Sequence, residues 1–417
     1  MSKPTFVISC PIDTYSGYGA RSRDIIKAII ATEKFDVKLL SQRWGNTRFG
    51  YLADHNEESM LSLIIPKVDN KPMYWMQITV PNEFQKVGTY NIGCTAGMET
   101  TQVAPEWLQG VNRMDVVITS SKHSKNVFEQ TIYDMKNNDT GATDQLKCQT
   151  PIEVIFEGVD TEKYFKKVST LNLDLINEQF CYLVVGQWMQ GGMGQDRKNI
   201  PYTIKTFLET FKNKIGSTPA LLLKTTSTNT SIMGEKRMLE QIDAIRKTVK
   251  GKLPNVYLLN GDLSDQEMNE LYNHSKVKVM VSHTKGEGFG RPLLEFTTTG
   301  KPIIASAWSG QADFLDANKS ILLGGDLQNV DKSAAVKGMI LEEAKWFTPN
   351  DAEVHKAYKE TFKHLKNALT GAKQQKSRTL KEFKLSDMFV VVDEFLTRNL
   401  PAPVVMTALK LPELPKL

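Results

Sequence analysis

Two glutamates lie eight residues apart in the glycine-rich segment 285–295 (KGEGFGRPLLE), a spacing that can support chemistry. The segment follows the apolar run 277–281, which predicts a strand, a loop and the start of a helix. Glu287 then lies in the loop, where it can meet a sugar ring or a developing positive charge. Glu295 lies in the first turns of the helix, where it can accept two hydrogen bonds from a vicinal diol such as a ribose. The alternative is an ordinary helix start, where acidic residues favour the helix dipole.

The loop between the two glutamates is predicted to bind an anion. Gly288, Phe289 and Gly290 form a tight turn, and Pro292 suits the first turn of the helix that follows. Backbone N–H groups at such a helix start can bind a diphosphate. We therefore predict Gly288, Phe289 and Gly290 as ligand-binding residues.

The elements that must position these residues alternate in an α/β pattern, which is typical of parallel sheets covered by helices. In the first half, we predict strands at residues 6–9, 37–40, 74–78, 116–119 and 152–156, and a helix at 20–30. In the second half, we predict strands at residues 182–185, 220–223, 256–259, 277–281, 303–305 and 321–323. Helices are predicted between them at residues 202–211, 235–249 and 266–272, and Ser264 with Glu267 forms a capping box before the last.

Other segments fall outside this alternation. Residues 137–150 and 227–234 are rich in turn-forming residues and are predicted to be exposed insertions. Residues 351–383 have a charged amphipathic pattern that predicts helix, and residues 400–417, with four prolines, are predicted to form an extended arm. The polar stretch 160–178 indicates a domain boundary. We predict domains at residues 1–168 and 169–384, followed by a helix and tail at 385–417.

The composition limits the class of protein. The 417 residues suffice for two domains with separate cores, and a net charge of +5 permits a polyanionic partner without requiring one. The four cysteines show no CxxC spacing, which favours a reducing compartment. The N-terminus lacks the apolar region of a signal peptide, and no run approaches the ~18 apolar residues of a membrane helix. We therefore predict a cytoplasmic protein without a membrane span; the oligomeric state stays open.

The Glu-x7-Glu pattern with its internal Gly-Phe-Gly, followed by residues 299–305 (TGKPIIA), resembles glycosyltransferase family 4, the retaining enzymes of the GT-B fold. The resemblance implies two Rossmann-like domains facing across a cleft, an acceptor domain followed by a donor domain, and a C-terminal helix that returns to the first. It implies a hexosyl- or pentosyltransferase with a nucleotide-diphosphate sugar as co-substrate. Glu287 would be catalytic and orient the sugar, and Glu295 would hold the donor ribose. No essential metal is predicted, because the Asp-x-Asp of the metal-dependent GT-A fold is absent from the chain.

Two further segments are interpreted through this resemblance. Gly17 and Gly19 follow the first strand and are predicted to face the donor phosphates, although a simple strand-to-helix turn explains them nearly as well. Arg21 and Arg23 either add positive charge there or are solvated helix residues. Glu99 falls on a loop after a strand and is predicted to be catalytic, with polar lining as the alternative. Many family members have a histidine in this region that contacts the sugar; this chain has none between His55 and His123.

The resemblance also implies cations for the diphosphate after the strand at 182–185. Lys198 matches the family lysine, but Gln187 stands where an arginine is expected, and Arg197 is predicted to compensate. The alternative is a surface Arg-Lys pair at a helix start, where the helix dipole disfavours cations. Arg197 and Lys198 are therefore predicted to be donor-binding residues.

The acceptor is the least determined partner. Residues 41–51 interleave aromatics with arginines and can stack a base, face a sugar or form a plain surface loop. Lysines at positions 122, 125, 163, 166 and 167 can flank a polyanion or be solvated. The chain also resembles glucosyl- or arabinosyltransferases of bacteriophages that modify hydroxymethylcytosine. DNA containing 5-hydroxymethylcytosine is therefore the predicted acceptor, in the host cytoplasm if a phage encodes the protein. A cell-surface or lipid-linked glycan, a non-catalytic nucleic-acid-binding GT-B protein and a nucleotide-sugar epimerase are the alternatives.

Overall fold

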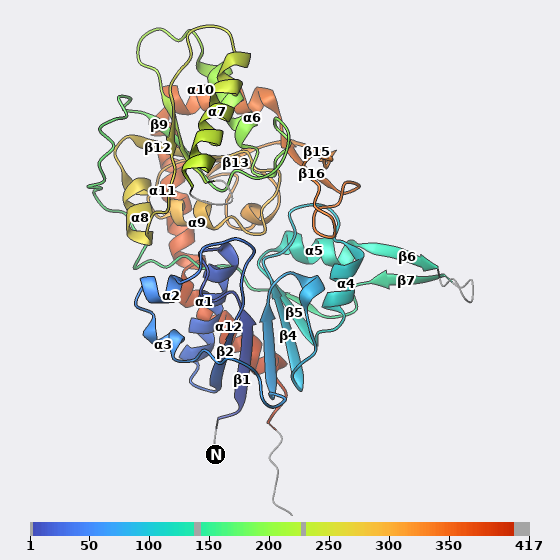
Figure 1. Ribbon diagram of the computed structural model, residues 1–417. Coiled ribbons are helices and arrows are strands. Elements are labelled where there is room, and N and C mark those ends of the chain that lie inside the picture. Colours follow the sequence, from blue (N-terminus) through green and yellow to red (C-terminus); the bar gives the residue numbers. More distant parts are fainter. Residues whose placement is uncertain (1–2, 137–142, 227–230, 404–417) are drawn as a thin grey trace, which may run out of the picture.

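The computed structural model describes residues 3–136, 143–226 and 231–403, which form two α/β halves (Figure 1). The first half contains a six-stranded parallel sheet in the order β2-β1-β3-β4-β5-β8. Its strands are β1 (Thr5–Cys10), β2 (Asp36–Ser41), β3 (Tyr74–Ile78), β4 (Tyr90–Thr95), β5 (Val116–Thr119) and β8 (Ile152–Val154). Its helices are α1 (Gly17–Ala31), α2 (Tyr51–Asp54), α3 (Glu58–Leu61), η1 (Pro81–Glu83), α4 (Pro105–Val111) and α5 (Lys122–Gln130).

The second half repeats the plan with a parallel sheet in the order β11-β10-β9-β12-β13-β14. Its strands are β9 (Cys181–Val185), β10 (Ala220–Lys224), β11 (Val256–Leu259), β12 (Val277–Ser282), β13 (Ile303–Ser306) and β14 (Ile321–Leu323). Its helices are α6 (Ile200–Phe211), α7 (Ile232–Thr248), α8 (Asp265–Asn273), α9 (Arg291–Thr297) and η2 (Gly310–Asp313). The capping box of Ser264 and Glu267 is confirmed at the start of α8.

The predicted strands are all present, whereas β4, in which Asn91 and Gly93 interrupt the apolar residues, is missing from the prediction. The strands in the middle of each sheet are buried on both faces. Helices cover both sides of a parallel sheet, so the strands are nearly continuous apolar runs. In β10, for example, the segment Ala-Leu-Leu-Leu is fully buried. Because β9 and β12 are parallel neighbours, the segments that follow them, 186–199 and 283–290, leave the same edge of the sheet. The candidate site residues on these segments are therefore brought together.

The C-terminal helices connect the two halves. Helices α10 (Asp351–Lys363) and α11 (Leu365–Glu382) occupy the predicted helical region, and α12 (Leu385–Asn399) follows. Met388, Val392, Phe395 and Leu396 of α12 are buried in the core of the first half, beside α1. The prediction that a C-terminal helix returns to the first domain is confirmed (Figure 1).

Two antiparallel hairpins are absent from the sequence prediction. Strands β6 (Ile132–Lys136) and β7 (Thr143–Lys147) pair with each other and project from the first half (Figure 1). Strands β15 (Gly325–Asn329) and β16 (Lys345–Pro349) form the second hairpin. The predicted exposed insertion at 137–150 is therefore partly a strand, and its residues 137–142 lie outside the described part. Residues 227–230 of the second insertion and 404–417 of the predicted arm also lie outside it, and α7 begins within the former insertion.

Candidate active site

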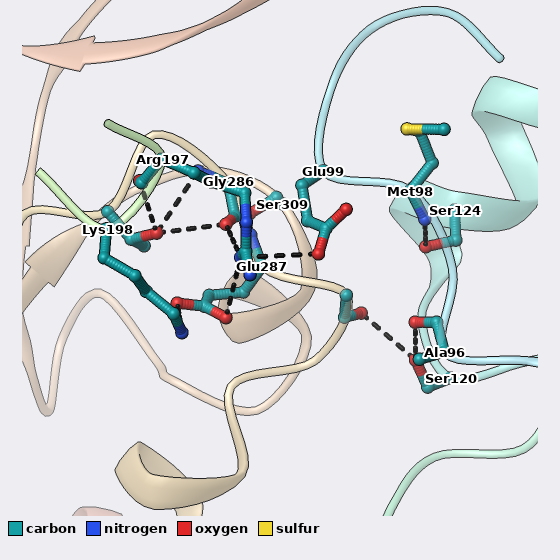
Figure 2. Close-up of polar contacts among 12 residues, drawn as sticks. Ala96, Met98, Glu99, Ser120, Ser124, Arg197, Lys198, Gly286, Glu287 and Ser309 are labelled. Atoms are coloured by element: carbon teal, nitrogen blue, oxygen red, sulfur yellow. Dashed lines mark hydrogen bonds and ion pairs between the residues drawn. The ribbon is translucent and has the colours of Figure 1, made fainter. Parts of the chain in front are cut away.

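Glu287 lies in the loop between β12 and α9, where two cations hold its carboxylate (Figure 2). Its Oε1 lies 2.6 Å from Nζ of Lys198, and its Oε2 lies 3.4 Å from Nη1 of Arg197. Burial alone would raise the pKa of Glu287, but Lys198 and Arg197 outweigh burial and hold the pKa below its ordinary value. Glu287 is therefore a buried, ionised carboxylate at neutral pH.

Arg197 connects the two carboxylates that the sequence analysis predicts to be catalytic. Its Nη1 lies 3.3 Å from Oε1 of Glu99 and donates a 2.8 Å hydrogen bond to the carbonyl oxygen of Gly286. Glu99 follows β4 in the first half, as predicted, whereas Arg197 precedes α6 in the second half. Gln187, which stands where the family has an arginine, is exposed. The guanidinium of Arg197 thus lies between the carboxylates of Glu99 and Glu287.

The loop that carries the first glutamate packs directly on the first half of the chain. A Cβ atom added to Gly286 would overlap the carbonyl oxygen of Glu99, and one added to Gly288 would overlap that of Ala96. Oγ of Ser120 lies 2.5 Å from the carbonyl oxygen of Ala96 and 3.2 Å from that of Gly288 (Figure 2). Glycine at these two positions therefore lets the two halves meet at the site.

The other loop residues predicted to bind a ligand have structural contacts. Gly290 adopts a φ of 102°, a left-handed conformation that favours glycine, and it caps α9. Phe289 is buried and packs on Phe314, with ring centroids 5.0 Å apart. The side chain of Phe289 belongs to the core, so any contact of this residue with a ligand is left to its backbone.

Glu295, in α9, shares its carboxylate between a tyrosine and an arginine. Oη of Tyr272 donates to its Oε2 at 3.2 Å, and Nε of Arg291 donates to its Oε1 at 3.2 Å. Burial raises the pKa of Glu295 to about 7, although Arg291 opposes the shift. This carboxyl group consequently titrates near neutral pH.

Arg291, to which the sequence analysis assigns no role, joins the two halves. Its Nη1 lies 2.5 Å from Oδ2 of Asp24 in α1 and 3.3 Å from Oε2 of Glu157, which follows β8. With Glu295, three largely buried carboxylates surround one guanidinium. The local sequence gives no signal for this contact, because the two partners in the first half are 267 and 134 residues away along the chain.

A cavity of about 250 Å³ lies between the start of α1 and Glu295. Gly17, at its wall, is exposed and has open space around it, as a ligand-facing glycine requires. Gly19 is buried, and a Cβ atom there would overlap the carbonyl oxygen of Thr14, so it permits close packing of α1. Further charged residues of the lining are Arg23, Asp24, Lys27, Glu57, Asp160, Lys163, Asp265 and Arg291. Glu287 and Lys198 are not part of this lining.

The interpretation of Arg21 and Arg23 as solvated helix residues is wrong. Arg21 is 1% exposed and donates to the carbonyl oxygens of Ile155 and Phe156, so it serves as an internal cross-link rather than a phosphate ligand. Arg23 is buried too, and its guanidinium lies 3.4 Å from the ring centroid of Tyr51. Of these two arginines, only Arg23 lines the cavity.

The basic residues considered for a polyanionic acceptor are mostly paired with acids. Lys125 pairs with Glu129 at 3.6 Å and Lys163 with Asp265 at 2.7 Å. Lys167 forms an ion pair with a glutamate of α8. These lysines therefore form part of the protein's own ion-pair network.

The aromatic loop considered for the acceptor is only partly exposed. Trp44 stacks on Tyr18, with ring centroids 4.0 Å apart, and Arg48 pairs with Asp54 at 2.6 Å. Phe49 stays 45% exposed, with the guanidinium of Arg43 lying 5.9 Å from its ring centroid. One exposed ring and one unpaired arginine therefore remain for contact with a partner.

Residues 3–136, 143–226 and 231–403 contain no group of three His, Cys, Asp or Glu side chains that could hold a metal ion. Within the same ranges, no helix has an apolar stretch long enough to cross a bilayer. Metal-independent catalysis stays a prediction.

Comparison with known proteins places this geometry in context. Residues 198–340 match the family model described as glycosyl transferases group 1, and this segment contains Lys198, Glu287 and Glu295. Comparison with curated protein sequences finds no significant match.

Several solved structures are similar over nearly the whole chain. HepE from Anabaena, in complex with UDP and glucose, is 14% identical with a TM-score of 0.57, covering 95% of this chain and 100% of that one. Sucrose-phosphate synthase from Thermosynechococcus elongatus is 13% identical with a TM-score of 0.61, covering 95% and 98%. A glycosyltransferase from Rickettsia africae is 12% identical with a TM-score of 0.61, covering 96% and 99%. These likenesses confirm the predicted fold, GT-B, with two Rossmann-like domains.

Proposed function

We propose that this protein is a retaining glycosyltransferase that moves a sugar from a nucleotide-diphosphate sugar to an acceptor hydroxyl. The observation that carries the proposal is the buried, ionised Glu287 between Lys198 and Arg197, eight residues before a second glutamate on the wall of a cavity. Both glutamates and Lys198 lie within the segment that matches group 1 glycosyl transferases.

In the proposed donor complex, the ribose diol donates to Glu295 and the nucleoside occupies the cavity beside it. The diphosphate lies between Lys198 and the backbone N–H groups near Gly288 and Gly290. Lys198 now neutralises Glu287, so an arriving diphosphate competes for this cation and frees the carboxylate to face the sugar. HepE is crystallised with UDP-glucose, which makes UDP-glucose the first donor to test.

In the proposed reaction, the bond from the sugar to the diphosphate breaks through an oxocarbenium-like state. Lys198 and Arg197 stabilise the charge that develops on the leaving diphosphate, and Glu287 orients the ring and stabilises the positive sugar carbon. The leaving diphosphate takes the proton from the acceptor hydroxyl, which then bonds to the sugar. Glu99 holds Arg197 in place from the other half of the chain.

The proposed acceptor is 5-hydroxymethylcytosine in DNA. Its support is the resemblance to phage enzymes, the net charge of +5, and the exposed Phe49 beside the unpaired Arg43. A glycan or lipid-linked acceptor is the competing assignment.

The test is mass spectrometry of nucleosides from hydroxymethylcytosine-containing DNA after incubation with the protein and a pool of nucleotide sugars. We expect the modified cytosine to gain one hexose or pentose, and Glu287→Gln to abolish the gain. Nucleotide diphosphate release without a gain on DNA would keep the transferase and move the acceptor to a glycan or lipid. Neither product from a folded protein would contradict the proposal and favour a non-catalytic binding protein.

A further inference from the structure

Ser309 has a backbone conformation that is almost restricted to glycine. Its φ is 64° and its ψ is −154°, and it lies between β13 and the short helix η2. Side chains are crowded in this region of conformational space, so a non-glycine residue there is strained. Ser309 is also buried, 6% exposed, so neither solvent nor a mobile surface loop accounts for the strain. Something else must compensate it.

Ser309, which lies beside Glu287 in Figure 2, and the next residue, Gly310, hold both main-chain polar groups of Glu287. The backbone N–H of Glu287 donates to Oγ of Ser309 at 2.9 Å, and the backbone N–H of Gly310 donates to the carbonyl oxygen of Glu287 at 3.0 Å. The strained turn at Ser309 places the Ser309 hydroxyl and the Gly310 N–H side by side. The strain and the two hydrogen bonds to Glu287 therefore belong to one arrangement.

The turn is fixed to the donor-half sheet behind it. Gln311 is fully buried, and its Nε2 donates to the carbonyl oxygen of Ser306, the last residue of β13, at 3.1 Å. A Cβ atom added to Gly310 would lie 2.6 Å from the Cα of Phe289, so the turn and the loop pack backbone against backbone. The turn that contacts Glu287 is therefore itself anchored to the sheet.

This brace matters once a donor is bound. The Glu287 side chain is held by Lys198 and Arg197, and both cations are needed for the diphosphate in the proposed function. When the diphosphate draws Lys198 away, the main-chain brace helps to keep Glu287 at the sugar. We propose that Ser309 is a positioning residue for Glu287, and that its strain persists because its hydroxyl group fixes this glutamate during turnover. This inference rests on the proposed function.

Two substitutions separate the strain from the hydroxyl group. Ser309→Gly relieves the strain and removes the hydroxyl, whereas Ser309→Ala keeps the strain and removes the hydroxyl. We expect kcat for donor turnover to fall about tenfold in both, the effect of one lost hydrogen bond at a reacting group, with donor KM within about threefold of wild type. The melting temperature should be at or above that of wild type in Ser309→Gly and lower in Ser309→Ala.

The matched control is Glu33→Gly. Glu33 has a left-handed φ of 56° on the exposed surface just after α1, so glycine there relieves strain far from the site. We expect this variant to keep its kcat. When Ser309→Gly is added to Glu287→Gln, the residual rate should not change further, since the positioned carboxylate is already gone.

Three results would overturn the inference. Full kcat in Ser309→Gly would show that the hydroxyl is dispensable, and a lower melting temperature in this variant would show that Ser309 serves stability. A folded wild-type protein that turns over no nucleotide sugar would overturn the proposed function and this inference with it. The first two results leave the proposed function intact, because neither concerns whether the wild-type protein turns over a nucleotide sugar.

Discussion

At the scale of single residues, the two glutamates of the Glu-x7-Glu pattern have opposite electrostatic environments. Glu287 lies between Lys198 and Arg197, which hold its pKa below the ordinary value. Glu295 is buried with one arginine and a tyrosine, and its pKa is raised to about 7. A carboxylate that stabilises positive charge must be ionised, whereas one that binds a diol is needed only as a hydrogen-bond acceptor. The two environments agree with the two proposed roles.

The raised pKa of Glu295 predicts that UDP binding weakens as pH falls. Below about pH 7 Glu295 is increasingly protonated, and a protonated carboxyl group accepts fewer hydrogen bonds from the ribose diol. The diol therefore contributes fully to the affinity for UDP above pH 8, and this contribution is lost as the pH falls through 7. Between pH 7 and 6 the affinity should fall by up to about tenfold. Calorimetric titration with UDP at pH 8, 7 and 6 measures this.

Titration with 2′-deoxy-UDP is the matched control, because its phosphates titrate as those of UDP do while its diol is missing. We expect the affinity difference between the two nucleotides to shrink at pH 6 and to vanish in Glu295→Gln. A difference that stays constant from pH 8 to 6 would contradict the assignment of Glu295 to the ribose.

At the scale of elements, the loops after β12 and β4 meet through glycines rather than side chains. The sequence analysis interprets Gly288 as a diphosphate ligand, and the structure adds that a Cβ atom there has no room beside the carbonyl oxygen of Ala96. The same glycine can serve both purposes, since a backbone that lies close to a neighbouring loop also exposes its N–H groups.

Gly288→Ala should therefore reduce activity by pushing the two loops apart. We expect the new methyl group to lower kcat for donor turnover by about 10²-fold, because a misplacement of about 1 Å at a reacting centre has such an effect. Gly192→Ala is the control, since a Cβ atom at Gly192 meets nothing closer than 3.4 Å. Equal kcat values for both variants would show that the loop contact is not needed.

At the scale of the whole molecule, Arg291 couples the donor helix α9 to the first half. Its guanidinium binds Asp24, Glu157 and Glu295, so one cation balances three acids from three separate segments. Without the arginine these carboxylates would repel one another across the boundary between the halves. The contact thus links Glu295, the glutamate proposed to bind the ribose, to the position of the first half.

Arg291→Met should open the molecule and weaken donor binding together. Removing one partner of a largely buried ion pair costs about 3–5 kcal/mol, and here the remaining acids also repel. We expect a larger radius of gyration in small-angle scattering and a donor KM raised at least about tenfold.

Arg398→Met is the control for Arg291→Met. Arg398 pairs with Glu153, and both residues pack with the first half, on α12 and β8. The Arg398→Met substitution should change neither the radius of gyration nor the donor KM. An unchanged radius in Arg291→Met would show that the halves are held by other contacts.

The sequence by itself determined what local pattern controls. Strands β3, β5, β11 and β14 were predicted to the residue, because each is a short and mainly apolar run. Strands β6, β7 and β15 escaped prediction because they are largely exposed and carry no such run. Lys198 and Glu287 meet because they follow β9 and β12, parallel neighbours whose carboxyl ends lie at one edge of the sheet.

Only the tertiary structure decided how these residues are paired. Arg197 contacts Glu99, Arg291 reaches Asp24, Arg21 is buried beneath β8, and the hydroxyl of Ser309 holds Glu287. Each contact joins segments that are distant in sequence. A charged side chain or hydroxyl looks the same in the sequence whether it meets water, an acid or a main-chain group. The sequence therefore showed which groups were available, and the packing of the two halves decided which partners they met.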